Sequence, residues 1–279
     1  MWKPCLVLLL LFVVEKSVVA CELIMGYRTN AKPPFINAAP DNSGLYFDLY
    51  EEAARRIDCR LIVLRQPKRR ILHFLKHGDI DFYPGLSFSE ERAQYVTFIP
   101  NGLKDGYIGL TRRSEPEIFS LNDVAKRNLV MVMAFGGYDL NAEDYGIHVR
   151  RPYDFTLEQI VDLIIEGRAD FHAYNLLAVQ HFLSNHPDKA AKLRMHQYCC
   201  SEPEQMYMAF SKQSAYAEMI DNADYLRHLP LTAENTPDSV SISSIAWKLR
   251  WALSSMQKDG SFQVIYGKYF GGAPMGRKN

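Results

Sequence analysis

One short motif occurs twice in the chain, each time at the end of an amphipathic segment. Gly-Asp-Ile-Asp-Phe occupies residues 78–82, and Gly-Arg-Ala-Asp-Phe occupies residues 167–171. Before each glycine, apolar residues recur at spacings of three and four, which is typical of a helix that ends there. The same helix-to-strand junction at two distant points predicts two lobes built on one plan. A cleft between two such lobes is a usual place for a small ligand.

Strand patterns and helix patterns alternate along most of the chain. The expected strands lie at residues 22–27, 60–64, 107–111, 129–133 and 206–210, and the expected helices lie at 45–57, 70–76, 157–166, 241–257 and from 260 onward. Thr156 with Gln159 fits a capping box, in which each side chain bonds the other residue's backbone N–H. This alternation predicts an α/β fold, with a mostly parallel sheet flanked by helices.

The first twenty residues have the features of an export signal. Lys3 gives a positive start, residues 6–14 are an unbroken apolar run, and a cut is expected after Ala20. Residues 18–21, Val-Val-Ala-Cys, also resemble the lipobox of bacterial lipoproteins, in which the cysteine is acylated and tethers the protein to a membrane. We therefore expect a periplasmic protein, with a lipid tether at Cys21 as an open alternative.

The cysteines agree with export to an oxidising compartment. After the leader is removed, Cys21, Cys59, Cys199 and Cys200 remain. A disulfide between Cys21 and Cys59 would join the amino terminus to the end of the first helix, and it competes with acylation for the same sulfur. Cys199 and Cys200 are adjacent and form either a vicinal disulfide or two separate buried thiols.

Charge and motif content exclude several functional classes. Lys plus Arg and Asp plus Glu both number 32, so the net charge is zero and gives no reason to expect nucleic acid as a partner. The chain has no phosphate-binding loop with lysine, no nucleophile elbow and no His-Glu-x-x-His. His73 and His77 have a metal-compatible spacing but no evident third ligand. We expect no metal and no cofactor.

The loop after the first motif is rich in hydroxyl groups and ends in an arginine. We expect Ser87 and Glu90 to form a capping box at the start of a short helix. Arg92 follows, and its planar fork suits a carboxylate. The alternative is that Arg92 pairs with Glu90 or Glu91 on a solvated helix end.

These motifs, taken in order, resemble the bacterial extracellular solute-binding proteins of family 3, the periplasmic components of ABC importers for polar amino acids. The resemblance covers nearly the whole chain after the leader, and its parts are Pro33-Pro34-Phe35, Gly44 with Asp48-Leu49, residues 78–81, residues 87–92, Gly167 with Asp170, residues 259–262 and residues 268–270. It implies the two-lobe periplasmic binding protein type II fold, with two crossing strands between the lobes and hinge closure on a ligand.

The resemblance also divides the chain and implies its partners. Residues 1–20 would be the signal peptide, 21–110 and 208–279 the first lobe, and 111–207 the second lobe. The implied function is capture of a small polar, carboxylate-bearing solute by a monomer that delivers it to a membrane permease. The implied protein is not an enzyme, although dehydratases with the same fold, or a ligand sensor for a membrane receptor, are the alternatives.

Ligand-binding positions follow from the resemblance residue by residue. Arg92 would hold the carboxylate of the ligand, and the other implied contacts are Ser87, Gly85, Phe35, Tyr27, Arg70, Phe135, Gly136, Gly137 and Asn175. For Arg70 the alternative is a basic helix start that faces solvent. One departure matters, because Asn175 stands where amino-acid binders place an aspartate for the ammonium group. A neutral amide gives a weaker bond than a carboxylate, so the identity of the ligand stays open.

Overall fold

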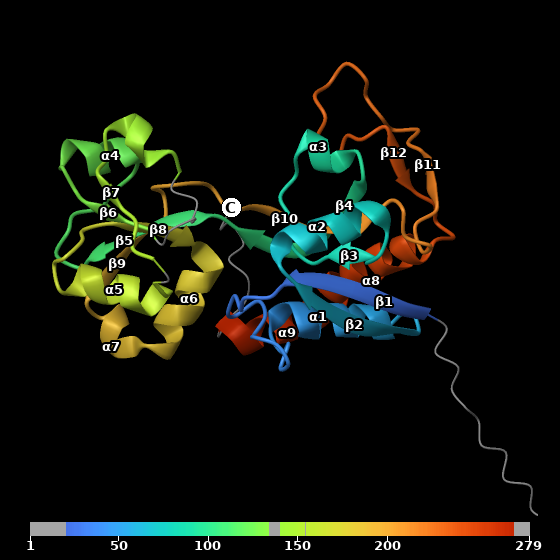
Figure 1. The fold of residues 1–279 in the computed structure, drawn as a ribbon, viewed down its shortest axis with the longest axis horizontal. Coiled ribbons are helices and arrows are strands. Elements are labelled where there is room, and N and C mark those ends of the chain that lie inside the picture. The colour runs from blue at the N-terminus through green and yellow to red at the C-terminus, as the bar shows by residue number, and fades with distance from the viewer. Residues whose placement is uncertain (1–20, 134–139, 154, 271–279) are drawn as a thin grey trace, which may run out of the picture.

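The protein forms two lobes, each built around its own β-sheet (Figure 1). The structure is a computed structural model, and it describes residues 21–133, 140–153 and 155–270. The expected leader, residues 1–20, lies outside the described residues. The two-lobe α/β fold predicted from the sequence is confirmed, with sheets that combine parallel and antiparallel pairs where mostly parallel ones were expected.

The first lobe contains a mixed sheet of five strands in the order β2-β1-β3-β10-β4. Its strands are β1 (Cys21–Arg28), β2 (Cys59–Gln66), β3 (Phe82–Tyr83), β4 (Val96–Asp105) and β10 (Glu204–Ser211). Strand β1 pairs in parallel with β2 and β3, whereas β10 runs antiparallel to both β3 and β4. Parallel pairing is thus kept to the strands that are joined through helices, and the two long strands that lead to and from the other lobe are antiparallel.

Helices cover both faces of this sheet. They are α1 (Leu45–Arg55), α2 (Lys68–His77), α3 (Glu90–Ala93), α8 (Ile245–Asp259) and α9 (Ser261–Phe270). The crossover from β1 to β2 and the crossover from β2 to β3 run in opposite directions, so right-handed connections place α1 and α2 on opposite faces. Helices α1, α8 and α9 contact one another, and a short hairpin, β11 (Met219–Asp221) with β12 (Asp238–Val240), precedes α8.

The second lobe has a three-stranded antiparallel sheet in the order β8-β5-β9 and a parallel pair, β6-β7. The strands are β5 (Tyr107–Arg112), β6 (Met131–Val132), β7 (Val149–Arg150), β8 (His172–Asn175) and β9 (Leu193–His196). The helices are α4 (Leu121–Lys126), α5 (Leu157–Ile165), α6 (Leu176–Asn185) and α7 (Pro187–Ala190), with a short 3-10 helix at Ala142–Tyr145.

The repeated motif has the same structural role in each lobe. In the first lobe, the buried carboxylate of Asp81 accepts the backbone N–H of Ile24 on β1 at 2.7 Å. In the second lobe, Asp170 accepts the backbone N–H of Val130, directly before β6, at 3.0 Å. The phenylalanine after each aspartate is fully buried. Each aspartate therefore connects the end of a helix to another strand of its own lobe, β1 in the first lobe and β6 in the second.

Of the two predicted capping boxes, one is wrong and one is confirmed. The helix at residues 90–93 is capped by Ser89, whose hydroxyl accepts the N–H of Arg92 at 3.3 Å, so the predicted Ser87 and Glu90 capping box is wrong. Ser89 has the extended backbone that a capping residue needs, and Ser87 lies farther up the loop. The predicted box of Thr156 and Gln159 is confirmed.

A disulfide joins Cys21 to Cys59, as expected. The two cysteines face each other as the first residues of the paired strands β1 and β2. Because the sulfur of Cys21 is used in this bond, it has no free thiol for a lipid. No helix in the described part of the chain has both the length and the apolar character that crossing a membrane would require.

His172 generates a prediction about stability and pH. Its imidazole is fully buried on β8, with Nδ1 donating to the carbonyl of Val132 at 2.8 Å and Nε2 unpartnered among the described residues. Burial lowers the pKa of His172 from its ordinary 6.5 to about 4. Below pH 6.5 the unfolded chain therefore binds a proton that the folded protein does not, so stability is lost as the pH falls from 6.5 to about 4.

We expect the variant His172→Gln to remove this dependence, since an amide can keep the bond to Val132 without titrating. The unfolding free energy of the wild type minus that of the variant should fall by about 3 kcal/mol between pH 7.5 and pH 4. Urea unfolding at a series of pH values measures it, and the subtraction cancels the carboxylates common to both proteins. A difference that stays constant with pH would contradict the assignment.

Candidate ligand-binding site

A cavity of about 980 Å³ lies where the chain passes between the two lobes. Its walls come from the carboxyl ends of β1 and β3, the starts of α1, α2 and α3, the two crossing segments and the start of α6. The residues that carry most of its polar groups are Tyr27, Arg28, Lys32, Tyr46, Lys68, Tyr83, Ser87, Arg92, Asp105, Asn175, Ser201, Glu202, Glu204, Gln205, Tyr207 and Glu234. Ligands settle at the carboxyl ends of strands in open α/β sheets, and this cavity has that position.

Three tyrosines form the base of the cavity in the first lobe. The rings of Tyr27 and Tyr83 stack with centroids 5.2 Å apart, and Tyr46 meets Tyr27 edge-on at 5.8 Å. All three are almost completely buried, and burial raises the pKa of each phenol. They are therefore neutral hydroxyl groups on a rigid apolar base near pH 7.

Arg65 on β2 holds the turn that follows β1. Its guanidinium donates to the carbonyl of Arg28 and to the carbonyl of Asn37, both at 2.8 Å, and lies 5.6 Å from the Tyr27 ring centroid. Lys32 in this turn lies 4.9 Å from the ring centroid of Phe35. The clamp from β2 thus positions both Arg28 and Lys32 along the cavity.

Two buried side chains fix the backbone of the loop that follows β3. Tyr50 and Asn101 both donate to the carbonyl of Pro84, at 2.6 and 3.0 Å. At the far end of this loop, the guanidinium of Arg92 donates to the carbonyl of Ser87 at 2.8 Å. These bonds present Ser87 and Arg92 together on the cavity wall. Neither Glu90 nor Glu91 forms an ion pair with Arg92 in the described structure.

Gly85 has no room for a side chain. A β-carbon there would lie 2.9 Å from the Cζ atom of Tyr46 and would overlap its hydroxyl oxygen. Tyr46 is 2% exposed and packs against Phe35 with centroids 5.0 Å apart, so it cannot move away. The backbone at this point is therefore open to the cavity because the residue is glycine.

The basic side chains of the first lobe influence one another across the cavity. Burial lowers the pKa of Lys68, and the charges of Arg28 and Arg92 lower it further. Burial also lowers the pKa of Lys32, whereas the negative charge of Asp105 raises it. The cavity therefore concentrates positive charge on one wall and has a carboxylate beside Lys32.

Asp105 ends β4 and meets the start of α6. One of its oxygens accepts the backbone N–H groups of Gly106 at 3.0 Å and Leu177 at 3.2 Å. Burial raises the pKa of Asp105, and the Leu177 N–H, the charge of Lys32 and a hydrogen bond from the Asn175 side chain all lower it. Asp105 and Asn175 are thus neighbours, although seventy positions separate them in the sequence.

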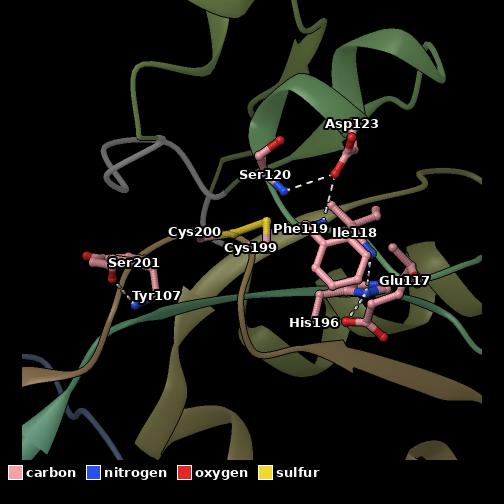
Figure 2. Close-up of a disulfide and its surroundings, with 11 residues drawn as sticks. Tyr107, Glu117, Ile118, Phe119, Ser120, Asp123, His196, Cys199, Cys200 and Ser201 are labelled. Atoms are coloured by element: carbon pink, nitrogen blue, oxygen red, sulfur yellow. Dashed lines mark hydrogen bonds and ion pairs between the residues drawn. A yellow bond between two sulfur atoms is a disulfide. The ribbon is translucent and has the colours of Figure 1, made fainter.

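The return passage runs beside the first one. Ser201 accepts the N–H of Tyr107 with its hydroxyl at 2.8 Å and donates its own N–H to the carbonyl of Tyr107 at 3.1 Å (Figure 2). Just before it, Cys199 and Cys200 form a disulfide, with Cys199 buried and Cys200 lining the cavity. Of the two states considered for these cysteines, the structure has the vicinal bond.

The two helical histidines at the predicted spacing do not lie in the cavity. Their rings are 4.2 Å apart, and Nδ1 of His77 bonds the carbonyl of His73 at 2.9 Å. In the described ranges, no three side chains of the metal-binding types gather into one group.

The structure brings five of the expected ligand positions to this cavity: Tyr27, Gly85, Ser87, Arg92 and Asn175. Phe35 is fully buried behind Tyr46, in the core and not on the lining. Arg70 also lies off the lining, because α2 begins at Lys68 and this earlier residue faces the cavity. The remaining positions, Phe135, Gly136 and Gly137, lie outside the described residues.

Sequence reasoning missed Arg28, Lys32, Lys68 and Asp105. Arg28 and Lys32 lie between the expected ligand positions Tyr27 and Phe35, and Lys68 lies two residues before Arg70. Assigning the ligand positions a few residues along the chain would have identified them. Asp105 had no signal in the sequence, because the strand that it ends, β4, was not predicted and the expected strand begins only at residue 107.

The model of the family described as "Bacterial extracellular solute-binding proteins, family 3" matches residues 23–272. No curated protein sequence matches the chain. Among solved structures, the Bacillus subtilis protein YCKB is 18% identical with a TM-score of 0.70, over 92% of this chain and 93% of that one.

Two further structures are similar in fold. The L-cystine solute receptor of Neisseria gonorrhoeae, unliganded and open, is 15% identical with a TM-score of 0.63, over 92% of this chain and 96% of its own. A histidine kinase sensor domain with similarity to periplasmic binding proteins is 17% identical with a TM-score of 0.61, over 91% and 98%. At these identities the structural likeness concerns the fold.

We expect Gly85→Ala to destabilise the protein by about 1–3 kcal/mol, because the added methyl group must displace the buried ring of Tyr46. Gly267→Ala is the matched control, since nothing lies near a β-carbon at that helical position and alanine favours helix. Urea unfolding of both variants measures the effect. Equal or greater stability of Gly85→Ala would contradict the packing described.

Proposed function

The chain belongs to family 3 of the bacterial extracellular solute-binding proteins, and from that membership we propose that it captures a small, polar, amino-acid-like solute carrying a carboxylate. The observation that carries the proposal is the cavity between the lobes, which is lined by Arg92 together with Ser87 and Gly85. Arg92 offers a charged fork, Ser87 a hydroxyl and Gly85 an open backbone. A carboxylate needs donors of this kind.

No covalent step is required for this function. Closure of two lobes around a ligand changes the relative population of open and closed forms, and the selectivity lies in the contacts made by the closed form. We propose that the closed complex is presented to the membrane permease of an ABC-type importer from the periplasm. The Cys21–Cys59 disulfide supports an oxidising location, and it favours a protein without a lipid on Cys21.

Sensing is the second candidate, because a sensor domain of a histidine kinase is among the structures with this fold. The same cavity would serve either function. Capture of detergent-solubilised membrane proteins on the ligand-loaded protein separates them, since transport requires a permease and sensing requires a receptor in the bound fraction.

The first experiment is a thermal-shift screen with amino acids, amines, dicarboxylates and cyclic acids. A ligand at one hundred times its Kd stabilises the folded protein by about 2.7 kcal/mol, which raises the Tm of a protein of this size by roughly 5–10 °C. We expect a carboxylate-bearing compound to produce this shift, and Arg92→Ala to weaken its binding about 10- to 100-fold because a charge-assisted bond is lost.

Arg70→Ala is the matched control for this experiment, because Arg70 is an exposed arginine off the cavity lining. It should bind as the wild type does. If carboxylates give no shift, or if Arg92→Ala responds as the wild type does, Arg92 is not the anchor and the proposed function fails.

A second prediction concerns the ammonium group of such a ligand. Position 175 carries no charge, but Asp105 lies beside Asn175 and lines the same cavity. We propose that Asp105 supplies the negative charge that amino-acid binders have at the position of Asn175.

Moving the negative charge from position 105 to position 175 tests this role directly. Asp105→Asn keeps an oxygen for the N–H groups of Gly106 and Leu177, and we expect it to bind an amino-acid ligand about 10-fold more weakly. The double variant Asp105→Asn with Asn175→Asp should recover most of the affinity. Calorimetric titration of the ligand found in the screen measures both, and full affinity in Asp105→Asn alone would exclude the role.

A further inference from the structure

Three basic side chains share one wall of the cavity, each from a different element of the first lobe. Arg28 ends β1, Lys68 begins α2 and Arg92 lies in α3. None of the three forms an ion pair with a carboxylate among the residues that the structure describes. In contrast, Arg56 binds Glu52 and Asp259, and Arg112 binds Asp170. Within the described residues, no ion pair therefore compensates the positive charge of this wall.

These charges are close enough to act on one another. After burial, the charges of Arg28 and Arg92 are what lower the pKa of Lys68. The Nε atom of Arg28 is also buried without a hydrogen-bond partner among the described residues. An anion on this wall would relieve the repulsion and would supply acceptors for the donors.

The carboxylates of the cavity lie elsewhere on its lining. Asp105, at the end of β4, acts electrostatically on Lys32. Glu234, on the loop between β11 and β12, accepts the hydroxyl of Tyr207. Glu202 and Glu204 belong to the return passage, and neither forms an ion pair with the basic wall in the described structure. Arg28, Lys68 and Arg92 thus keep three positive charges for a ligand.

The proposed function uses one of these charges, that of Arg92, for one carboxylate. Resting on that function, we propose that the ligand carries a second anionic group, which Arg28 and Lys68 bind. The ligand class is then an amino acid with an acidic side chain, with either a carboxylate or a phosphate as the second anion. A neutral side chain would leave two cations without a partner, and a cationic one would add a like charge.

The test compares ligands that differ only in this second charge. We would titrate the protein expressed from its full chain with L-glutamate against L-glutamine, L-aspartate against L-asparagine, and O-phospho-L-serine against L-serine, by calorimetry. The acidic member of at least one pair should bind at least 10-fold more tightly, because charge-assisted bonds are stronger than neutral ones. The pair with the larger preference distinguishes a carboxylate from a phosphate. The preference should also shrink as salt is raised.

Variants assign the preference to the wall. Lys68→Gln and Arg28→Gln should each reduce the preference for the acidic member by about 10-fold while leaving binding of the neutral member within a few-fold. Arg70→Gln, a matched change in the same helix off the cavity lining, should leave the preference unchanged. Thermal melts of the unliganded variants establish that they fold. If Arg28→Gln does not fold, the binding preference of Lys68→Gln by itself is the test.

The outcomes separate this inference from the function on which it rests. Equal binding of acid and amide, with both still dependent on Arg92, overturns the inference and leaves the proposed function intact. A preference that survives in Lys68→Gln and Arg28→Gln also overturns it. Absence of binding by every carboxylate compound in the screen overturns both.

Discussion

The fold depends on the short connections by which the chain passes from the sheet of one lobe to the sheet of the other. Strand β4 ends at Asp105 and β5 begins at Tyr107, so Gly106 alone separates two strands that belong to different lobes. A β-carbon at Gly106 would lie 3.0 Å from the carbonyl oxygen of Glu202, on the return passage. The two passages therefore run in contact, and Ser201 bonds both backbone groups of Tyr107 (Figure 2). The cavity of the proposed ligand site is lined in part by these two passages, including Asp105, Gly106, Tyr107, Ser201 and Glu202.

Each lobe is stabilised by the same local device. Asp81 and Asp170 follow a helix that ends at glycine, and each accepts an N–H group at or just before a strand of its own lobe, β1 or β6. A carboxylate that accepts such bonds connects segments distant in the sequence. Two other segments that are far apart in the sequence meet in a similar way. The carboxylate of Asp48 on α1 accepts hydrogen bonds from the side chains of both Lys268 and Tyr269 on α9. These contacts join distant segments within each lobe.

The charges of the cavity are divided between its walls. The first lobe contributes Arg28, Lys68 and Arg92, and the crossing contributes Asp105 beside Asn175. An amino-acid-like ligand has the complementary division, with anionic groups at one end and an ammonium group at the other. Under the proposed function, Asp105 would supply from another strand the negative charge that position 175 lacks.

Patterns in the sequence were sufficient for the fold. Apolar periodicity, the Gly-x-x-Asp-Phe repeat and the family motifs predicted two α/β lobes, and Cys21 with Cys59 was paired correctly. The predicted elements correspond to β1, β2, β5, β6, β10, α1, α2, α5, α8 and α9, but β4, β8, β9 and α6 had no prediction. These features depend on neighbours in the chain or on burial of one face, which a linear pattern records. The loop from Gly85 to Arg92 was also recognisable, because its residues lie close together in the sequence.

Only the tertiary structure decided which side chains share the cavity. A shift of two residues in the start of α2 replaces Arg70 by Lys68, and the packing of Tyr46 places Phe35 behind it. Asp105 and Asn175 become neighbours because the end of β4 contacts the start of α6, where the N–H of Leu177 bonds Asp105. These residues are far apart in the chain. The sequence by itself determined the two lobes and the loop that carries Arg92. Long-range packing decided which other charged side chains share the cavity with that loop. No local sequence pattern encodes which distant residues become neighbours.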